Sequence, residues 1–275
     1  MWQSRSGCET MPYLAKSASP IVSAHRVLLM GPPNTFKTTA IIETWPKPLA
    51  IQVYPGERGD ATIPRDRKDV RPFVWQDDPL NKTSSADVVN QTETLTWEIL
   101  GGKHGPVTSF AGDGIHKYYG AILNWVTGGA SGKGEDFETR LYARAHEHFT
   151  YYLQRVMASP VENVVFTCWD GKEADNPDQK QGPSHIFPDL PGKMAKRIMG
   201  EFSVVIYSIA DFAARQPNKP VPCKWQLLPE GKVWGAAVKA PTQVVLNLPI
   251  YIPQSYQALK EALEAAYVKA QGGRK

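Results

Sequence analysis

The 275-residue sequence predicts an α/β fold, in which helices flank a mainly parallel central sheet and antiparallel strands extend it near the C-terminus. Apolar segments of strand length alternate with segments of helical periodicity through most of the chain, as in successive βαβ units. The alternation ends at two strand-like segments, 223–228 and 232–238, on either side of Pro-Glu-Gly. These two segments predict a β-hairpin, which would be the antiparallel extension.

Local signals set the bounds of each expected element. The first apolar run ends at Gly-Pro-Pro, the first helix ends at Trp-Pro-Lys-Pro, and the second helix ends at a glycine pair. A long helix keeps its apolar residues on one face, and the continuous apolar run after it is typical of a buried parallel strand. The expected strands are 26–30, 49–54, 72–75, 107–111, 161–167, 204–209 and 244–252, and the expected helices are 37–44, 92–100, 116–126, 137–157, 193–202 and 256–270.

Composition narrows the class of protein. Hydrophobic residues make up 42% of the chain and charged residues 21%, which excludes a wholly disordered or fibrous protein. No apolar run is long enough to span a bilayer and no signal-peptide pattern is visible, so we expect a cytoplasmic protein without membrane contact. The three scattered cysteines fit reduced thiols, and the net charge of +4 permits a polyanionic partner without requiring one.

Residues 31–39 nearly match the phosphate-binding loop pattern G-x-x-x-x-G-K-[ST] between an expected strand and an expected helix. In such a P-loop, backbone N–H groups surround the phosphates, the lysine reaches the β- and γ-phosphates and the Ser/Thr hydroxyl binds Mg²⁺. We therefore expect ATP and Mg²⁺ as ligands, with Lys37 catalytic and Thr38 on the metal. The nucleotide would contact Gly31, Pro32, Pro33, Asn34, Thr35, Phe36, Lys37, Thr38 and Thr39.

Phe36 stands where the pattern has its second glycine. If the backbone there has a positive φ, a non-glycine residue costs about 1–3 kcal/mol of strain. If the backbone is helical, the benzyl group instead crowds the phosphates or the sheet. Two functions follow: a working ATPase, or a non-catalytic nucleotide-binding or assembly protein whose aromatic ring occludes the phosphate pocket.

Two acidic residues can complete an ATPase site. Asp113 follows the expected strand 107–111, where a carboxylate would hold Mg²⁺ through water, although Gly-Asp-Gly is also an ordinary turn sequence. Glu57 follows the strand after the P-loop helix and would activate the attacking water. A solvated loop glutamate is the alternative there, and Asp60 is a second candidate for the base.

The strand 161–167 ends where ligands collect in open α/β sheets, so Thr167 or Asp170 can sense the γ-phosphate. Trp169 is expected in the core or on a stacking surface. The following loop mixes basic and aromatic residues, a combination that suits single-stranded nucleic acid through phosphate contacts and base stacking. The loop also carries four acids, so an ordinary solvated loop is the alternative. The nucleic-acid candidates are Lys172, Lys180, Phe187 and Lys193.

These features resemble the RecA/Rad51 class of P-loop ATPases. More narrowly, they are similar to phage-encoded nucleotide-binding proteins with a minimal RecA-like core, some of which are single-strand annealing recombinases. The resemblance implies a RecA-like P-loop NTPase core at residues 22–252, an irregular arm at 1–21, and a C-terminal helix and tail at 253–275. The matching pieces are 31–39, 55–57, 112–117, 163–170, 190–193 and the closing hairpin.

The resemblance also implies an assembly of identical subunits with ATP between them. In this class the hydrolytic glutamate follows the strand after the P-loop helix, which matches Glu57. A basic residue near the terminal hairpin reaches the neighbour's nucleotide, which points to Lys239, with Lys232 as the alternative. The loop after strand 161–167 would bind single-stranded DNA during phage-type recombination or replication. A small-molecule kinase is a third function, disfavoured because no compact arginine cluster forms a lid.

Overall fold

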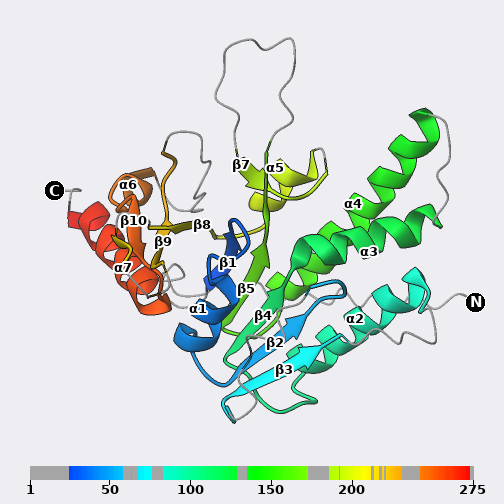
Figure 1. The fold of residues 1–275 in the computed structure, drawn as a ribbon, viewed down its shortest axis with the longest axis horizontal. Helices are drawn as coiled ribbons and strands as arrows, with labels where there is room; N and C mark the ends of the chain where they lie inside the picture. Colours follow the sequence, from blue (N-terminus) through cyan, green and yellow to red (C-terminus); the bar gives the residue numbers. More distant parts are fainter. Residues whose placement is uncertain are drawn as a thin grey trace, which may run out of the picture.

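The protein is described from a computed structural model, in which an eight-stranded sheet is the central element (Figure 1). The strands are β1 (His25–Met30), β2 (Leu49–Val53), β3 (Val70–Val74), β4 (Ser109–Asp113), β5 (Asn163–Cys168), β8 (Val204–Ala210), β9 (Cys223–Gln226) and β10 (Tyr251–Pro253). The described residues are 25–57, 63, 67–75, 83–128, 135–172, 186–191, 193–211, 214–216, 219, 221–230 and 242–272.

The sheet confirms the predicted mixture of parallel and antiparallel strands. The strand order is β10-β9-β8-β1-β5-β4-β2-β3, and the strands from β8 to β3 in this order pair in parallel. β9 pairs antiparallel with both β8 and β10. Because β5 lies between β1 and β4, the carboxyl ends of these three strands meet at one edge of the sheet.

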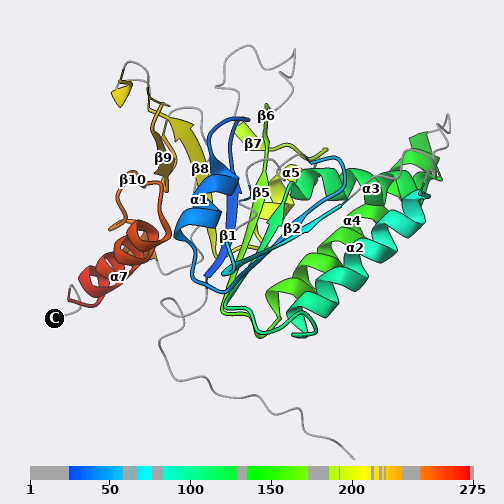
Figure 2. The same cartoon turned by 60° about the horizontal axis from the view of Figure 1, so that its bottom comes forward.

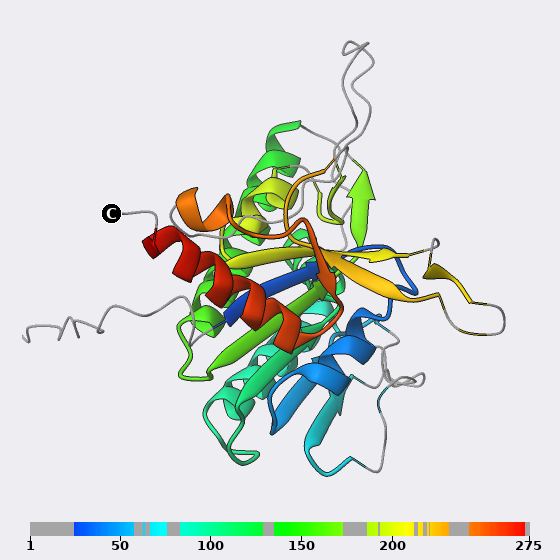
Figure 3. The ribbon, with the colours of Figure 1, turned by 90° about the vertical axis from the view of Figure 1, so that its left-hand side faces the viewer.

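Helices cover both faces of the sheet (Figure 2). α2, α3, α4 and α5 lie on one face, and α1, α6 and α7 lie on the other, where α1 and α7 are seen together in Figure 3. The helices are α1 (Lys37–Thr44), α2 (Ser85–Leu100), α3 (Ile115–Thr127), α4 (Glu135–Met157), α5 (Met194–Met199), α6 (Thr242–Val245) and α7 (Tyr256–Gly272).

The alternation of side chains along β1 shows how one strand serves both faces. Leu28 and Met30 pack in the core under α2 to α5, whereas Val27 and Leu29 pack in the core under α1 and α7. All four side chains are fully buried. The four apolar residues that end β1 therefore suit the centre of a sheet that is covered on both faces.

The expected strand at 244–252 is wrong over its first part. Residues Thr242–Val245 form α6, and the strand begins only at Tyr251. Pro249 explains the late start, because proline has no N–H to donate to a ladder and stays out of strand interiors. The expected second hairpin strand, 232–238, lies outside the described residues, and the described partners of β9 are β8 and β10.

Two features were not expected from the sequence. Asp170–Lys172 (β6) and Ile186–Pro188 (β7) pair antiparallel and form a separate two-stranded sheet directly after β5. α2 begins earlier than the expected 92–100 because the Ser84 hydroxyl caps it, accepting the backbone N–H of Asp87 at 3.2 Å.

Within the described part of the chain, no helix is both long and apolar enough to cross a bilayer.

Gly112 in β4 lies where the sheet has no space for a side chain. A Cβ at this position would overlap the Phe166 ring and lie 2.7 Å from the Tyr54 hydroxyl oxygen, both fully buried. We expect Gly112→Ala to lower the free energy of unfolding by about 1–3 kcal/mol through overpacking. Gly120 in α3 is the matched control because a Cβ there meets no atom within 4 Å.

Gly120→Ala is expected to raise the free energy of unfolding by roughly 0.5–1 kcal/mol, since alanine is the better helix former. Urea unfolding followed by circular dichroism measures both variants. Equal stability of Gly112→Ala and the unmodified protein would contradict the packing described for β4.

Candidate functional site

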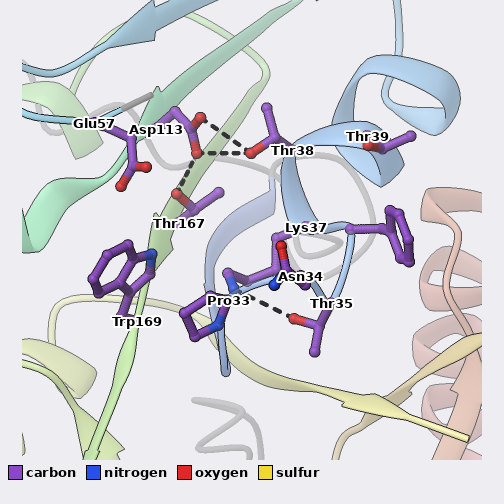
Figure 4. A pocket seen from close by; sticks show the side chains of 11 residues that line it. Pro33, Asn34, Thr35, Lys37, Thr38, Thr39, Glu57, Asp113, Thr167 and Trp169 are labelled. Atoms are coloured by element: carbon purple, nitrogen blue, oxygen red, sulfur yellow. Dashed lines mark hydrogen bonds between the residues drawn. The ribbon is translucent and has the colours of Figure 1, made fainter. Parts of the chain in front are cut away.

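A cavity of about 280 Å³ opens at the sheet edge where β1, β4 and β5 end (Figure 4). The loop between β1 and α1 forms one wall, and the ends of β2, β4 and β5 form the other. Every residue from Pro33 to Thr39 contributes, so the first turn of α1 is part of this wall. The lining residues are Pro33, Asn34, Thr35, Phe36, Lys37, Thr38, Thr39, Glu57, Asp113, Thr167 and Trp169.

The loop is held in shape by hydrogen bonds within itself and to residues of β8 and the segment after β10. The Thr35 carbonyl accepts from Ser208 Oγ at 3.1 Å and from Gln254 Nε2 at 2.8 Å, and Thr35 Oγ1 donates to the Pro32 carbonyl at 2.9 Å. Gly31 has φ 146°, and a Cβ there would lie 2.5 Å from the Ser208 carbonyl oxygen. The first glycine of the pattern is therefore required by both backbone conformation and space.

Lys37 folds back onto its own loop. Its Nζ donates to the carbonyls of Gly31 at 2.9 Å and Pro32 at 2.7 Å and to Thr35 Oγ1 at 3.3 Å, which occupies all three ammonium donors. The side chain is buried, and burial lowers the pKa of Lys37 against the opposing effect of nearby acids, chiefly Asp113. An arriving phosphate would replace these loop oxygens as the acceptor.

Phe36 adopts the left-handed conformation, with φ 52° and ψ 30°, at the position just before α1. Of the two alternatives set by the sequence, the structure shows the positive φ, which costs a bulky residue about 1–3 kcal/mol. Asn34 also has a positive φ, of 63°, but asparagine tolerates it better. The Phe36 side chain is 44% exposed, so its ring is not buried against the sheet.

Asp113 is the centre of a buried hydrogen-bond network. Its carboxylate accepts from Thr38 Oγ1 at 3.0 Å to each oxygen and from Thr167 Oγ1 at 2.5 Å. Thr167 Oγ1 in turn accepts the backbone N–H of Gly114 at 2.8 Å. Burial is the largest influence on Asp113 and raises the pKa of its carboxyl, although the two threonines oppose the shift.

The oxygens of this network are suited to Mg²⁺. A hard cation of this kind is usually held by one or two protein oxygens together with phosphates and water. Thr38 Oγ1 and the Asp113 carboxylate already face each other at hydrogen-bond distance, and a cation beside them would offset the burial of the carboxylate. In the described part of the chain no group of three or more His, Cys, Asp or Glu side chains is placed to hold a metal alone.

Glu57 reaches the same cavity from the end of β2, and Figure 4 shows it beside Asp113, across the pocket from Thr38. The Glu57 side chain is 15% exposed and lies against Gly114, where a Cβ would come within 2.8 Å of Glu57 Cγ. The glycine after Asp113 therefore makes room for this carboxylate. Its φ of 84° also favours glycine.

Sequence reasoning gave no role to two residues beside Glu57. His116 Nε2 lies 3.9 Å from Glu57 Oε2, and the imidazole packs on the Trp169 ring with centroids 4.8 Å apart. Lys117 Nζ lies 4.3 Å from the centroid of the same tryptophan ring. His116 was visible in the sequence only as part of a helix start, because its neighbours in space come from the segments that follow β2 and β5.

The remaining predicted residues are spread more widely. Asp170 accepts from the Tyr207 hydroxyl at 2.9 Å and does not line the cavity. Lys193 is exposed just before α5. Lys172 ends β6, whereas Lys180 and Lys239, with the alternative candidates Asp60 and Lys232, lie outside the described residues.

Phe187 does not fit its expected role. Its ring is 5% exposed and packs in the core beneath α5, with Lys196 Nζ 5.0 Å from the ring centroid. A ring in this position is not open to stacking on a nucleic-acid base. The aromatic residue of the loop is explained instead by the packing of the β6–β7 sheet on the core.

A P-loop with Lys-Thr, followed across the sheet by an acidic residue hydrogen-bonded to that threonine, defines the class of P-loop ATPase domains. The sequence matches the AAA domain family, AAA_24, over residues 23–224, and the chain belongs to this family. It is therefore an AAA-type P-loop ATPase domain. Among curated proteins, none matches the sequence.

Solved structures with a similar fold are ATPases of bacterial secretion systems. One is a prototypical ATPase from the type III secretion system of pathogenic bacteria, with 12% identity, 72% of this chain and 54% of that chain covered, and a TM-score of 0.44. Another is the assembled ATPase EscN from enteropathogenic E. coli, with 12% identity, 72% and 46% covered, and a TM-score of 0.44. A third is EscN in complex with its central stalk EscO, with 10% identity, 72% of this chain and 45% of that chain covered, and a TM-score of 0.45. The chain spans about half the length of these proteins.

The strain at Phe36 predicts an unusual response to mutation. Phe36→Gly removes about 1–3 kcal/mol of strain and adds roughly 0.5–1 kcal/mol of backbone entropy cost, so the free energy of unfolding is expected to rise by about 1 kcal/mol. Phe36→Val is expected to lower it, because a β-branched residue tolerates a positive φ poorly. Phe36→Asn, which accepts this conformation, is the control. Urea midpoints measure all three, and a loss of stability in Phe36→Gly equal to that in Phe36→Val would contradict the strain.

Proposed function

We propose that this protein binds ATP with Mg²⁺ in the cavity beside the P-loop and hydrolyses the γ-phosphate. The observation that carries the proposal is the buried network in which Thr38 and Thr167 both donate to Asp113. This network joins the P-loop helix to two neighbouring strands and supplies the oxygens that Mg²⁺ prefers. A fold without a nucleotide would gain little from burying this carboxylate, because burial of a charge is unfavourable.

Each pocket residue has a distinct task in the proposed reaction. Lys37 exchanges its loop carbonyls for phosphate oxygens, and Thr38 with Asp113 holds the metal, directly or through water. Mg²⁺, when bound, neutralises charge that develops on the phosphates. Glu57, on the wall opposite the P-loop, accepts the proton of the attacking water. Thr167 lines the same cavity, where it can sense the γ-phosphate.

The pocket also supports an assembly of identical subunits, as the resemblance to the RecA class implies. Among the described lining residues Lys37 is the one cation, whereas charge stabilisation of phosphoryl transfer normally uses a further Arg or Lys. We propose that a neighbouring subunit supplies this cation, with Lys239 as the candidate and Lys232 as the alternative. ATP would then lie at the interface between subunits.

Single-stranded DNA is the partner we propose, in phage-type recombination or replication. β6 follows β5, which carries Thr167, and pairs with β7, so that this small sheet holds the two ends of the segment predicted to bind DNA. Lys193, Lys196 and Arg197 are exposed beside this small sheet and can contact phosphates. Phe187 is buried and is not among the DNA contacts that we propose.

Phe36 supports one alternative, a nucleotide-binding or assembly protein without catalysis. The fully occupied donors of Lys37 describe a loop that is held together without phosphate, and Phe36 stands at its turn where the pattern has glycine. If Phe36 blocks nucleotide binding, Phe36→Gly restores it. If the protein is a working ATPase, binding is present before any substitution.

Steady-state ATP turnover with and without single-stranded DNA tests the proposal. Glu57→Gln is expected to lower kcat about 10²–10⁴-fold with ATP binding retained, because it removes the base alone. Lys37→Ala is expected to weaken ATP binding itself. No turnover in the unmodified protein under either condition, together with DNA binding that is indifferent to ATP, would overturn the proposed function.

A further inference from the structure

His116 is a buried polar residue beside Glu57 and Trp169. Its side chain is 4% exposed at the start of α3, and neither ring nitrogen has a hydrogen-bond partner among the described residues. Burial, with Lys117 and Lys37 nearby, lowers the pKa of His116 to about 3, so the imidazole is neutral near pH 7. A neutral imidazole still carries one N–H donor and one acceptor.

This burial is unfavourable for the fold. Each buried polar atom left without a partner costs about 1–3 kcal/mol, and the fold carries two of them on one ring. A leucine could fill the same space against Trp169 without that cost. Residues that lower stability in a well-packed region are found mainly at functional sites.

The neighbours of His116 indicate what its N–H faces. Nε2 lies 3.9 Å from Glu57 Oε2, too long for a hydrogen bond and short enough that a small rotation of either side chain closes the gap. Trp169 packs against the imidazole ring, and Gly114 leaves the space in which the carboxylate lies. A small movement of His116 therefore brings its N–H to the Glu57 carboxylate.

We propose that His116 is a positioning residue for Glu57, and this inference rests on the proposed function of Glu57 as the base. When ATP and the attacking water fill the cavity, Nε2–H donates to one Glu57 carboxylate oxygen and leaves the other facing the water. The water oxygen attacks the γ-phosphorus, its proton passes to Glu57, and the bond from the γ-phosphorus to ADP breaks. His116 keeps its own proton throughout.

Three substitutions separate positioning from a structural role. His116→Leu is expected to keep or raise Tm, to leave KM for ATP unchanged and to lower kcat about 100-fold, as for a misplaced reactive group. His116→Gln can place an amide N–H near the position of Nε2, and its kcat is expected to be at least about tenfold higher than that of His116→Leu. His116→Asn places its amide near Nδ1 instead and is expected to recover little.

A second readout does not depend on turnover. The complex with Mg²⁺, ADP and aluminium fluoride imitates the transition state, and the unmodified protein is expected to gain more Tm from it than from Mg²⁺ with ADP alone. His116→Leu and Glu57→Gln are each expected to lose this additional gain, and the double variant to lose no more than either single variant.

The results that overturn the inference differ from those that overturn the proposed function. A fall in Tm that parallels the fall in kcat for His116→Leu, or equal recovery by Gln and Asn, shows a structural role for His116 while leaving Glu57 as the base. Unchanged kcat in Glu57→Gln overturns the proposed function. Protein that binds Mg²⁺ with ATP, lacks turnover and gains nothing further from aluminium fluoride overturns both.

Discussion

The hydrogen bonds from Thr38 and Thr167 to the Asp113 carboxylate are the constraint on which the site depends. They require the P-loop helix, β4 and β5 to meet at one edge of the sheet, and the order β1-β5-β4 brings them together. A buried carboxylate is unfavourable unless donors or a cation compensate it. The position of the acid therefore links the topology of the sheet to the chemistry of the pocket.

The P-loop is stabilised from outside the pocket. Ser208 on β8 and Gln254 after β10 both donate to the Thr35 carbonyl, so the strand beside β1 and the segment after the antiparallel strands both fix the loop. This support also explains how Phe36 keeps a strained backbone, since strain persists only where surrounding contacts determine the conformation. Phe36, at the position of the second glycine, keeps the left-handed conformation and places an exposed ring at the turn of the loop.

Local signals made the P-loop and most elements predictable, because Lys37, Thr38 and the glycine and proline breakers act within a few residues. Whether Asp113 lies beside Thr38 depends on the order of the strands in the sheet, which the sequence alone does not give. Phe187 was predicted to be exposed because the residues around it are polar, yet it packs in the core. The strand prediction for 244–252 relied on apolar content and gave too little weight to Pro249. His116 escaped notice because its missing hydrogen-bond partners are a property of three-dimensional packing, with no pattern in the sequence.

The dependence of ATP affinity on Mg²⁺ tests the central claim most directly, because the Thr38–Asp113 pair is described as the place where metal and phosphate meet. Equilibrium titration of the unmodified protein with ATP, once with Mg²⁺ and once with a chelator, gives the two dissociation constants. Binding with Mg²⁺ is expected to be at least about tenfold tighter, or about 1.4 kcal/mol. Equal affinity in the two conditions, or no binding in either, would contradict it.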